Sequence, residues 1–222
     1  MNINDEHIVF FDVDNTIIKG YSLKYFIKYL SNEKIISKNK LLLTYIWFIL
    51  YKLRIIRKVN YSFKFLFKFL KGWQVDKFDI IVNDFFNRNI KDIIFKDSAN
   101  KINEHLNLGH KIILVSTSIY PIVNIIAKNF GIQDILATKL EIINNRYTGG
   151  IEGNVLEGNN KLKEIKYYLN NINNKKIITY FYTDHYSDVD VLNFVDKPFV
   201  VNPDKFFLNF SKNKGWEILN FN

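Results

Sequence analysis

The sequence predicts an α/β protein in which a doubly wound parallel sheet is interrupted, after its first strand, by an all-helical segment. Three features of the chain predict this class. Residues 7–13 are a short run of apolar, β-branched and aromatic side chains, which is typical of a buried strand. Residues 22–98 carry apolar side chains at helical spacing only. From residue 101 onward strand-like and helix-like segments alternate, as they do in parallel sheets with right-handed crossovers.

The all-helical segment contains four candidate helices. Its most apolar stretch, residues 41–51, has no charged side chain and is flanked by Lys40 and Lys52. These eleven residues are fewer than the roughly 20 that a membrane-spanning helix needs, so a buried or interfacial helix is expected here. The predicted helices cover residues 21–30, 41–56, 61–70 and 75–90.

The alternating part contains two helices that are expected to end at Gly109 and Gly131. Strands are predicted at 111–118, 135–142, 177–184 and 199–202, a hairpin-like stretch at 147–151, and helices at 101–108, 121–130, 160–169 and 188–194. We therefore expect residues 1–19 and 97–222 to form a Rossmann-like core, and residues 20–96 to form a helical cap.

Length and composition are those of an ordinary globular protein. A chain of 222 residues that is 48% hydrophobic can bury one core and a smaller satellite. The absence of cysteine excludes disulfides and thiolate zinc sites, and it fits a reducing compartment. Residues 1–11 contain no apolar stretch of the secretory type, so a cytoplasmic location is expected.

Positive charge is concentrated in the helical segment. From Lys19 to Lys71 the chain has 13 Lys and Arg residues against a single acid, Glu33, so this stretch carries +12 while the whole chain carries +9. The natural partner of such a segment is an anion: a phosphorylated metabolite, an anionic membrane surface in peripheral contact, or nucleic acid. Nucleic acid is disfavoured, because the alternating Phe residues of 61–70 fit core packing better than base stacking.

Polar side chains follow three of the predicted strands. Because ligands of open α/β sheets bind beyond the carboxyl ends of the strands, these side chains are expected to meet at one edge. Together they contain the parts of a phosphoryl-transfer site. The acids are Asp12, Asp14, Asp184 and Asp188, the hydroxyl residues are Ser116 and Thr117, and Lys161 stands at the start of a later helix.

Each residue type has a chemical reason. In an extended strand Asp12 and Asp14 lie on the same side, where their charges repel unless a cation lies between them. A set of oxygen ligands suits Mg²⁺. A carboxylate attacks phosphorus only when the phosphate charge is masked, and a metal, a lysine and the N–H groups of a helix N-terminus near Thr117 can mask it. Taken singly, Asp14 or Asp188 also fits a helix cap or a turn.

Four motifs in this order resemble those of the haloacid dehalogenase (HAD) superfamily of phosphatases, in the phosphoserine-phosphatase-like branch (subfamily IB) with a helical C1-type cap. FDVDNT, VSTS, the lysine of EGNNKLKEI and YTDHYSDVD match its four motifs. ILATKLEI, NRYTGG, GNNK and VNPD resemble a subgroup of HAD-type hydrolases of loosely defined substrate. The resemblance covers nearly the whole chain outside the helical segment.

The resemblance implies a role for each site residue. Asp12 is the nucleophile that becomes an aspartyl-phosphate, and Asp14 protonates the leaving group and then activates water. The main-chain carbonyl of Asp14 and the side chain of Asp184 hold Mg²⁺, with Asp188 bonded to the metal's shell. The metal set is Asp12, Asp14, Asp184 and Asp188, and the phosphate set is Thr16, Ser116, Thr117 and Lys161.

The chain departs from phosphoserine phosphatases at two places. Those enzymes have an acid soon after the first motif to receive the substrate ammonium, whereas residues 19–23 here contain Lys19 and Tyr21 and no acid. The double glycine after the serine of the second motif is replaced by Thr117 and Ser118. In the fourth motif His185 stands where a small residue is usual; it either touches the substrate or is a neutral, exposed loop histidine.

Three functions remain open from the sequence. The leading one is a Mg²⁺-dependent phosphomonoester hydrolase that forms an aspartyl-phosphate and acts on a small phosphorylated metabolite. The second is a lipid-phosphate phosphatase of the phosphatidylglycerophosphate type, working at an anionic membrane surface. The third is a non-catalytic phosphate-binding module, which the complete set of acids disfavours.

Overall fold

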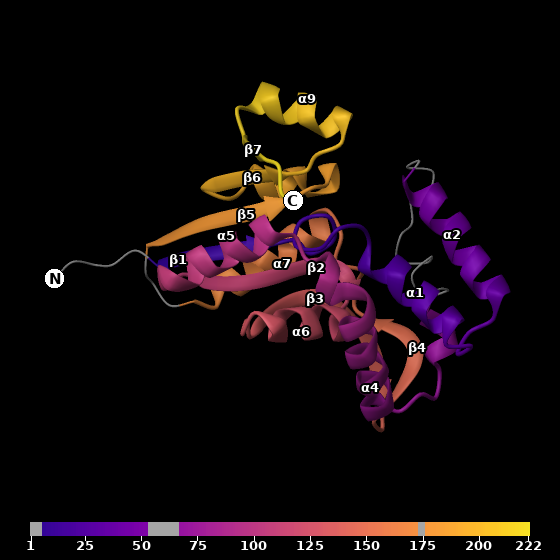
Figure 1. Cartoon of the computed structure of the whole chain (residues 1–222). Helices are drawn as coiled ribbons and strands as arrows, with labels where there is room; N and C mark the ends of the chain where they lie inside the picture. The colour runs from indigo at the N-terminus through magenta and orange to yellow at the C-terminus, as the bar shows by residue number, and fades with distance from the viewer. Residues whose placement is uncertain (1–5, 53–66, 173–175) are drawn as a thin grey trace.

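The computed structural model describes residues 6–52, 67–172 and 176–222. Within these ranges a seven-stranded sheet has the order β4-β3-β2-β1-β5-β6-β7 (Figure 1). All neighbouring strands pair in parallel except β3 and β4, which form an antiparallel hairpin. The predicted α/β fold class is therefore confirmed. The strands are β1 (Glu6–Phe11), β2 (Lys111–Ile119), β3 (Asp134–Ile143), β4 (Arg146–Glu152), β5 (Ile177–Thr183), β6 (Lys197–Val201) and β7 (Glu217–Leu219).

Strand β1 is the central strand and is apolar on both faces. Val9 and Phe11 belong to one hydrophobic cluster and Ile8 and Phe10 to another, and all four are fully buried. A central parallel strand covered by helices on both sides needs this continuous apolar run. The core helices are α5 (Lys96–Asn107) and α6 (Tyr120–Asn129) on the first face, and α7 (Asn159–Asn170), α8 (Val189–Leu192) and α9 (Lys205–Lys214) on the second.

Between β1 and β2, the described part of the inserted segment is mainly helical, as predicted. Its elements are α1 (Ser22–Asn32), α2 (Lys38–Lys52), α4 (Val75–Phe85), the 3₁₀ turns η1 (Lys68–Leu70) and η3 (Lys91–Ile93), and the π-helical turn η2 (Phe86–Ile90). Phe26 of α1 packs edge-on against Phe78 and Phe85 of α4, which gives the segment an aromatic centre. Figure 1 shows α1, α2 and α4 grouped to one side of the sheet, with α2 outermost. The division into a core of residues 1–19 and 97–222 and a cap of residues 20–96 stays a prediction.

Two short sets of backbone hydrogen bonds, each called a seam, join this segment to the sheet. Where the chain leaves and re-enters the core, Lys19 N–H donates to Ile93 C=O and Phe95 N–H donates to Ile17 C=O, both at 2.9 Å. The second seam joins the β3–β4 hairpin to residues 72–75: Tyr147 accepts from Gly72 N–H at 2.8 Å and donates to Trp73 C=O at 2.9 Å.

Gly149 allows the close approach of the hairpin to η1 in the second seam. Its φ is +82°, and a Cβ there would lie 3.1 Å from the backbone of Lys68. A side chain at this position would therefore push the hairpin away from η1.

Several element boundaries differ from the sequence-based expectation. Strand β2 runs on to Ile119, with a register shift between Ser116 and Ile119, so the strand does not end at residue 118. The helix predicted at 188–194 is a 3₁₀ turn, η4 (Tyr186–Asp188), followed by the short α8. Helix α9 and strand β7 were not predicted. Residues 53–66, which include parts of two predicted helices, lie outside the described residues. Within the described ranges no helix is both long and apolar enough to cross a membrane.

Three histidines meet at the amino edge of the sheet. His7 stacks on His110 with ring centroids 4.4 Å apart. His105 Nδ1 lies 2.8 Å from His110 Nδ1, and its Nε2 lies 2.9 Å from the Tyr182 hydroxyl. Burial, followed by the neighbouring His110, lowers the pKa of His105 from its usual 6.5 to about 4. The folded protein therefore holds His105 neutral.

This cluster predicts a loss of stability in mild acid. The unfolded chain binds the His105 proton below about pH 6.5, whereas the folded chain binds it only near pH 4. The free energy of unfolding should therefore fall by roughly 2 kcal/mol between pH 6.5 and pH 4 through this residue. Urea denaturation of the wild type and His105→Gln at several pH values measures it, because both proteins share every other titrating group. An unchanged slope in His105→Gln contradicts the assignment.

Candidate active site

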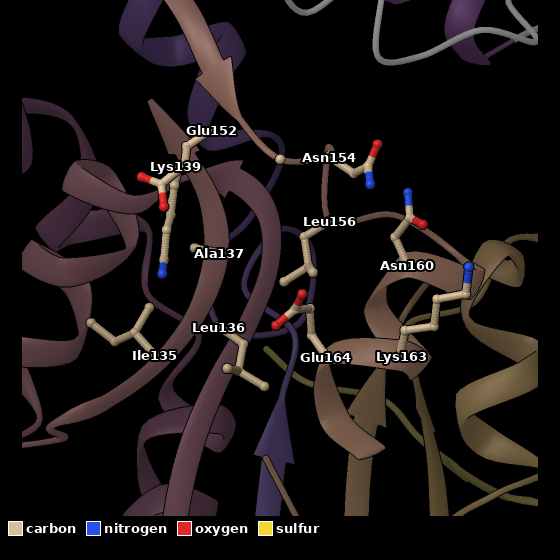
Figure 2. A pocket seen from close by; sticks show the side chains of 11 residues that line it. Ile135, Leu136, Ala137, Lys139, Glu152, Asn154, Leu156, Asn160, Lys163 and Glu164 are labelled. Atoms are coloured by element: carbon tan, nitrogen blue, oxygen red, sulfur yellow. The ribbon is translucent and has the colours of Figure 1, made fainter. Parts of the chain in front are cut away.

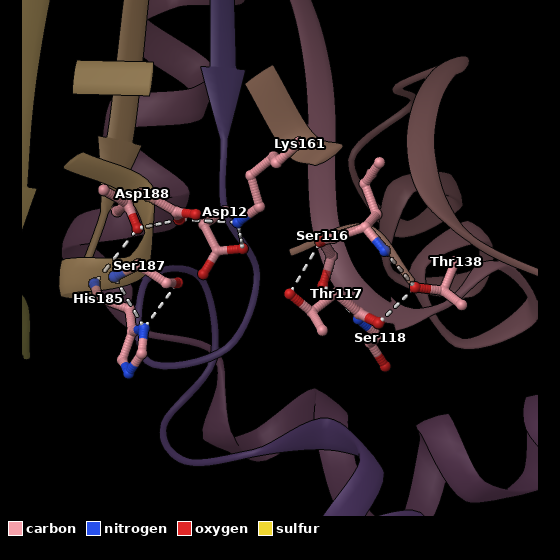
Figure 3. Close-up of polar contacts among 11 residues, drawn as sticks. Asp12, Ser116, Thr117, Ser118, Thr138, Lys161, His185, Ser187 and Asp188 are labelled. Carbon is pink, nitrogen blue, oxygen red and sulfur yellow. Dashed lines mark hydrogen bonds and ion pairs between the residues drawn. The ribbon is translucent and has the colours of Figure 1, made fainter. Parts of the chain in front are cut away.

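The predicted site residues gather at the carboxyl edge of the central strands. Phe11, the last residue of β1, pairs with Leu114 of β2 and with Tyr182 of β5. Asp12 follows this row directly, and Ser116 and Asp184 lie two residues beyond it on the neighbouring strands. Parallel strands in this register bring all three side chains to one edge. Figure 3 shows Asp12, Lys161, Ser116 and Asp188 together at this edge.

Lys161 is the centre of the site. It lies in the first turn of α7 with only 2% of its surface exposed. Its Nζ is 3.1 Å from Asp12 Oδ1 and 2.7 Å from Asp188 Oδ2 (Figure 3). The Thr183 hydroxyl donates to the same Asp188 oxygen at 2.7 Å. A buried ammonium shared by two carboxylates is stable only when all three groups are in place.

Burial gives the acids of the site unusual proton affinities. It raises the pKa of Asp12 to about 7, an effect that Lys161 opposes and that Asp188 and Asp14 increase. Burial also raises the pKa of Asp14 to about 6, although the N–H of Ser22 opposes this rise. The pKa of Asp184 is raised by burial and then by the charges of Asp12 and Asp188. Burial is therefore the main reason that these three carboxyl groups hold protons more tightly than usual.

Asp14 also connects the site to the helical segment. Its Oδ1 accepts the N–H of Ser22, the first residue of α1, at 2.8 Å. The Ser22 hydroxyl in turn donates to the Ser118 hydroxyl of β2 at 2.8 Å, and both serines are buried. The N-cap of α1 is Tyr21, so the interpretation of Asp14 as the capping residue is wrong, although its Oδ1 does accept the N–H of the first helical residue.

The predicted phosphate-binding hydroxyls have different surroundings. The buried Ser116 Oγ accepts the N–H of Ser118 at 3.1 Å. Thr117 donates its hydroxyl to Leu156 C=O at 3.0 Å, so that hydrogen is already used. Because α6 begins only at Tyr120, the N–H groups near Thr117 belong to a strand, and the expected helix N-terminus there is wrong. Thr16 is fully buried, and its Oγ1 has no hydrogen-bond partner among the residues that the structure describes.

The acids fit a divalent cation. Asp188 Oδ1 is buried without a hydrogen bond, and the Asp184 side chain has neither hydrogen bond nor ion pair within the described ranges. In the same ranges no three histidine or acidic side chains are already grouped to hold a metal. The metal ligands implied by the family include fewer side chains than three, because the main-chain carbonyl of Asp14 supplies one ligand. Hard carboxylate and carbonyl oxygens are the ligands that Mg²⁺ prefers.

His185 is half-buried, so the expectation of an exposed loop histidine is wrong. Its Nδ1 lies 2.8 Å from Ser187 Oγ and accepts the Ser187 N–H at 3.2 Å, which caps the turn η4 (Figure 3). The main-chain N–H of His185 donates to the Thr183 hydroxyl at 3.3 Å. The ring therefore supports the turn that carries Asp188.

Three residues that hydrogen-bond to the site or support it were not predicted from the sequence. Ser118 and Thr183 stand next to recognised motif residues, so their positions offered a signal. Ser22 offered none, because its link to Ser118 joins residues 96 positions apart.

A separate cavity of about 320 Å³ lies beside the site, between β3 and the start of α7 (Figure 2). Its lining includes Ile135, Lys139, Asn160 and Glu164, and none of the four acids of the site. It is thus distinct from the cluster around Lys161.

Comparison with known sequences places the chain in a family. The sequence profile of the haloacid dehalogenase-like hydrolases matches residues 9–193, a range that contains every residue of the cluster. The chain belongs to this family and is an enzyme of the HAD phosphatase type.

Related sequences match nearly the whole chain at low identity. Phosphoserine phosphatase SerB1 of Mycobacterium tuberculosis is 26% identical over 222 residues, covering 96% of this chain and 70% of the relative. A probable phosphatase of the same organism, Rv3661, is 27% identical over 218 residues, covering 96% and 74%.

Solved structures agree on the fold. A Bordetella pertussis Tohama I protein of unknown function superposes with a TM-score of 0.89 at 21% identity, over 97% of this chain and 99% of that one. A phospho-aspartyl intermediate analogue of phosphoserine phosphatase superposes with a TM-score of 0.64 at 16% identity, over 98% and 94%.

The Lys161 pairs predict a large effect of removing the lysine. Lys161→Met leaves two buried carboxylates without their cation, so the free energy of unfolding should fall by about 3 to 5 kcal/mol. Lys163→Met changes an exposed lysine on the same helix and should cost less than about 0.5 kcal/mol. Urea denaturation compares the two; equal stability of both variants would show that the pairs contribute nothing.

Proposed function

We propose that the protein is a Mg²⁺-dependent phosphomonoester hydrolase that works through an aspartyl-phosphate on a small phosphorylated metabolite. One observation carries this proposal: Lys161 is buried between Asp12 and Asp188 at the strand edge where Asp14 and Asp184 also stand. A lysine beside several unneutralised carboxylates supports both a phosphate and a metal.

Asp12 is the proposed nucleophile. Lys161 holds its Oδ1, and Oδ2 has no hydrogen bond in the part of the chain that the structure describes. In the first step Oδ2 attacks phosphorus, the bond from phosphorus to the ester oxygen breaks, and Asp14 gives that oxygen a proton. In the second step water attacks the phosphoryl group on Asp12 and gives a proton to Asp14, and inorganic phosphate leaves.

The surroundings of Asp14 suit this double duty. Burial raises its pKa to about 6, so a proton is available near neutral pH. The Ser22 N–H fixes Oδ1 and thereby orients the carboxyl group.

The charge of the phosphate is balanced by Lys161 and by the metal. Asp12, Asp184 and the main-chain carbonyl of Asp14 would hold Mg²⁺, with Asp188 bonded to its shell. When bound, the metal supplies positive charge that masks the phosphate oxygens. Ser116 and Thr16 would bind the same oxygens through their hydroxyls.

Phosphoserine, the substrate named for the Mycobacterium tuberculosis relative, is not the preferred substrate in this proposal. The residues between the first motif and α1 include the exposed Lys19 and the half-buried Tyr21, and no acid that could pair with a substrate ammonium. A phosphomonoester without a nearby positive charge suits this entrance better.

A phosphorylated lipid is the second candidate substrate. The observation in its favour is the exposed apolar side of α2, where Leu42 and Ile49 are 60% and 58% exposed. The two candidates share the same chemistry at Asp12 and differ in what the helical segment meets.

Asp12→Asn tests the proposed nucleophile. With Mg²⁺ and an aryl phosphate, turnover should fall by roughly 10³-fold or more, and the phosphorylated aspartate seen after acid quench of the wild type should be absent. Asp190→Asn changes an exposed acid nearby and should leave turnover unchanged. EDTA should stop the wild-type reaction, and added Mg²⁺ should restore it. Wild-type protein that binds phosphate but never turns it over would favour the non-catalytic module.

A substrate panel tests the proposed specificity. The values of kcat/KM for phosphoserine, an aryl phosphate and a phosphorylated lipid are compared with Mg²⁺ present. We expect phosphoserine to be the poorest of the three, because nothing in residues 19–23 pairs with its ammonium. A clear preference for phosphoserine would contradict this specificity while leaving the proposed mechanism intact.

A further inference from the structure

The outer side of helix α2 carries an apolar stripe made of Leu42, Leu43, Ile46 and Ile49. These side chains are between 44% and 60% exposed. Positions 42, 46 and 49 follow the helical repeat and so lie along one line, and Leu43 lies beside it. Four large apolar side chains on a single exposed helix face are unusual for a surface that meets only water.

The stripe lies on the side of α2 that faces away from the protein, because the opposite side is packed against other elements. The inner side of α2 contacts α1, where the ring of Tyr45 lies 5.4 Å from Lys24 Nζ. Leu41 packs against the main hydrophobic cluster. Figure 1 shows α2 as the outermost helix of its segment, with α1 between it and the sheet.

Helices α1 and α2 carry several lysines. Helix α2 contains three lysines and no acid. Lys38, in its first turn, is exposed, as are Lys24 and Lys28 of the adjoining α1. The one acid between residues 19 and 71, Glu33, is already paired with Arg88 at 3.2 Å. The two helices that carry and adjoin the stripe therefore contain lysines and no acid of their own.

We propose that this face of α2 docks on an anionic membrane surface, with the stripe inserted at the level of the lipid headgroups and the lysines contacting lipid phosphates. Exposed apolar side chains with lysines close by bind an anionic surface in this way, the former entering the headgroup level and the latter contacting phosphates. The helix is 15 residues long, and no helix in the described ranges can span a bilayer. The helix thus lies along the surface.

Charge complementarity selects lipid over a second copy of the chain. A symmetric pairing through the stripe would bring the lysines of α1 and α2 in both copies together, and like charges disfavour that contact. An anionic surface attracts the same lysines, at about 1 kcal/mol for each one near the surface. This proposal concerns binding alone and does not rest on the proposed catalytic mechanism.

Co-sedimentation with vesicles tests the proposal. The wild-type chain should bind vesicles of equal parts phosphatidylglycerol and phosphatidylcholine at least about tenfold more tightly than vesicles of phosphatidylcholine alone, and added salt should weaken this binding. Leu42→Ser/Ile46→Ser should lose about tenfold in affinity for the anionic vesicles. The matched control is Leu106→Ser/Leu108→Ser. It changes two exposed leucines at the end of α5, outside the helical segment, and should bind as the wild type does.

Turnover of a small aryl phosphate and circular dichroism confirm that each variant is folded. Three results would overturn the proposal. The first is wild-type protein that does not bind anionic vesicles. The second is a Leu42→Ser/Ile46→Ser variant that binds them undiminished, which would show attraction by the lysines alone. The third is a wild-type dimer that this variant converts to a monomer, which would assign the stripe to a second copy.

Discussion

The site depends on one buried ammonium shared by two carboxylates. Lys161 comes from the start of α7, Asp12 from the end of β1 and Asp188 from the turn after β5. None of these groups is stable in the interior alone, because an unpaired buried charge costs several kcal/mol. The three elements are therefore fixed relative to one another by the same contacts that assemble the chemistry.

The same arrangement leaves more negative than positive charge at the strand edge. Four carboxylates share the edge with Lys161; burial raises the pKa of Asp12, Asp14 and Asp184, and neighbouring acids raise it further for Asp12 and Asp184. Charges of one sign held together in a low-dielectric place attract a cation strongly. A cation bound among these carboxylates, as in the proposed function, would relieve this repulsion and so stabilise the folded chain.

Much of the core could be predicted because its signals are local. The apolar run of β1 and the acids that follow it stand within a few residues of each other. Lys161 was a candidate from its place at a helix start, but that place alone resembles any solvated lysine, and the family motif strengthened the prediction. The histidine cluster around His105 and the link from Ser22 to Ser118 join distant positions, so no local pattern marks them. Strand β7 is three residues long, too short for periodicity to show.

The seam between the β3–β4 hairpin and residues 72–75 holds one part of the helical segment against the sheet. Tyr147 bonds to Gly72 and Trp73 through its backbone, and Gly149 lets η1 approach closely. Helix α1 is held at a different place, because Ser22 donates its N–H to Asp14 and its hydroxyl to Ser118 of β2. Any displacement of α1 from β2 would therefore also break the hydrogen bond that orients the carboxyl group of Asp14.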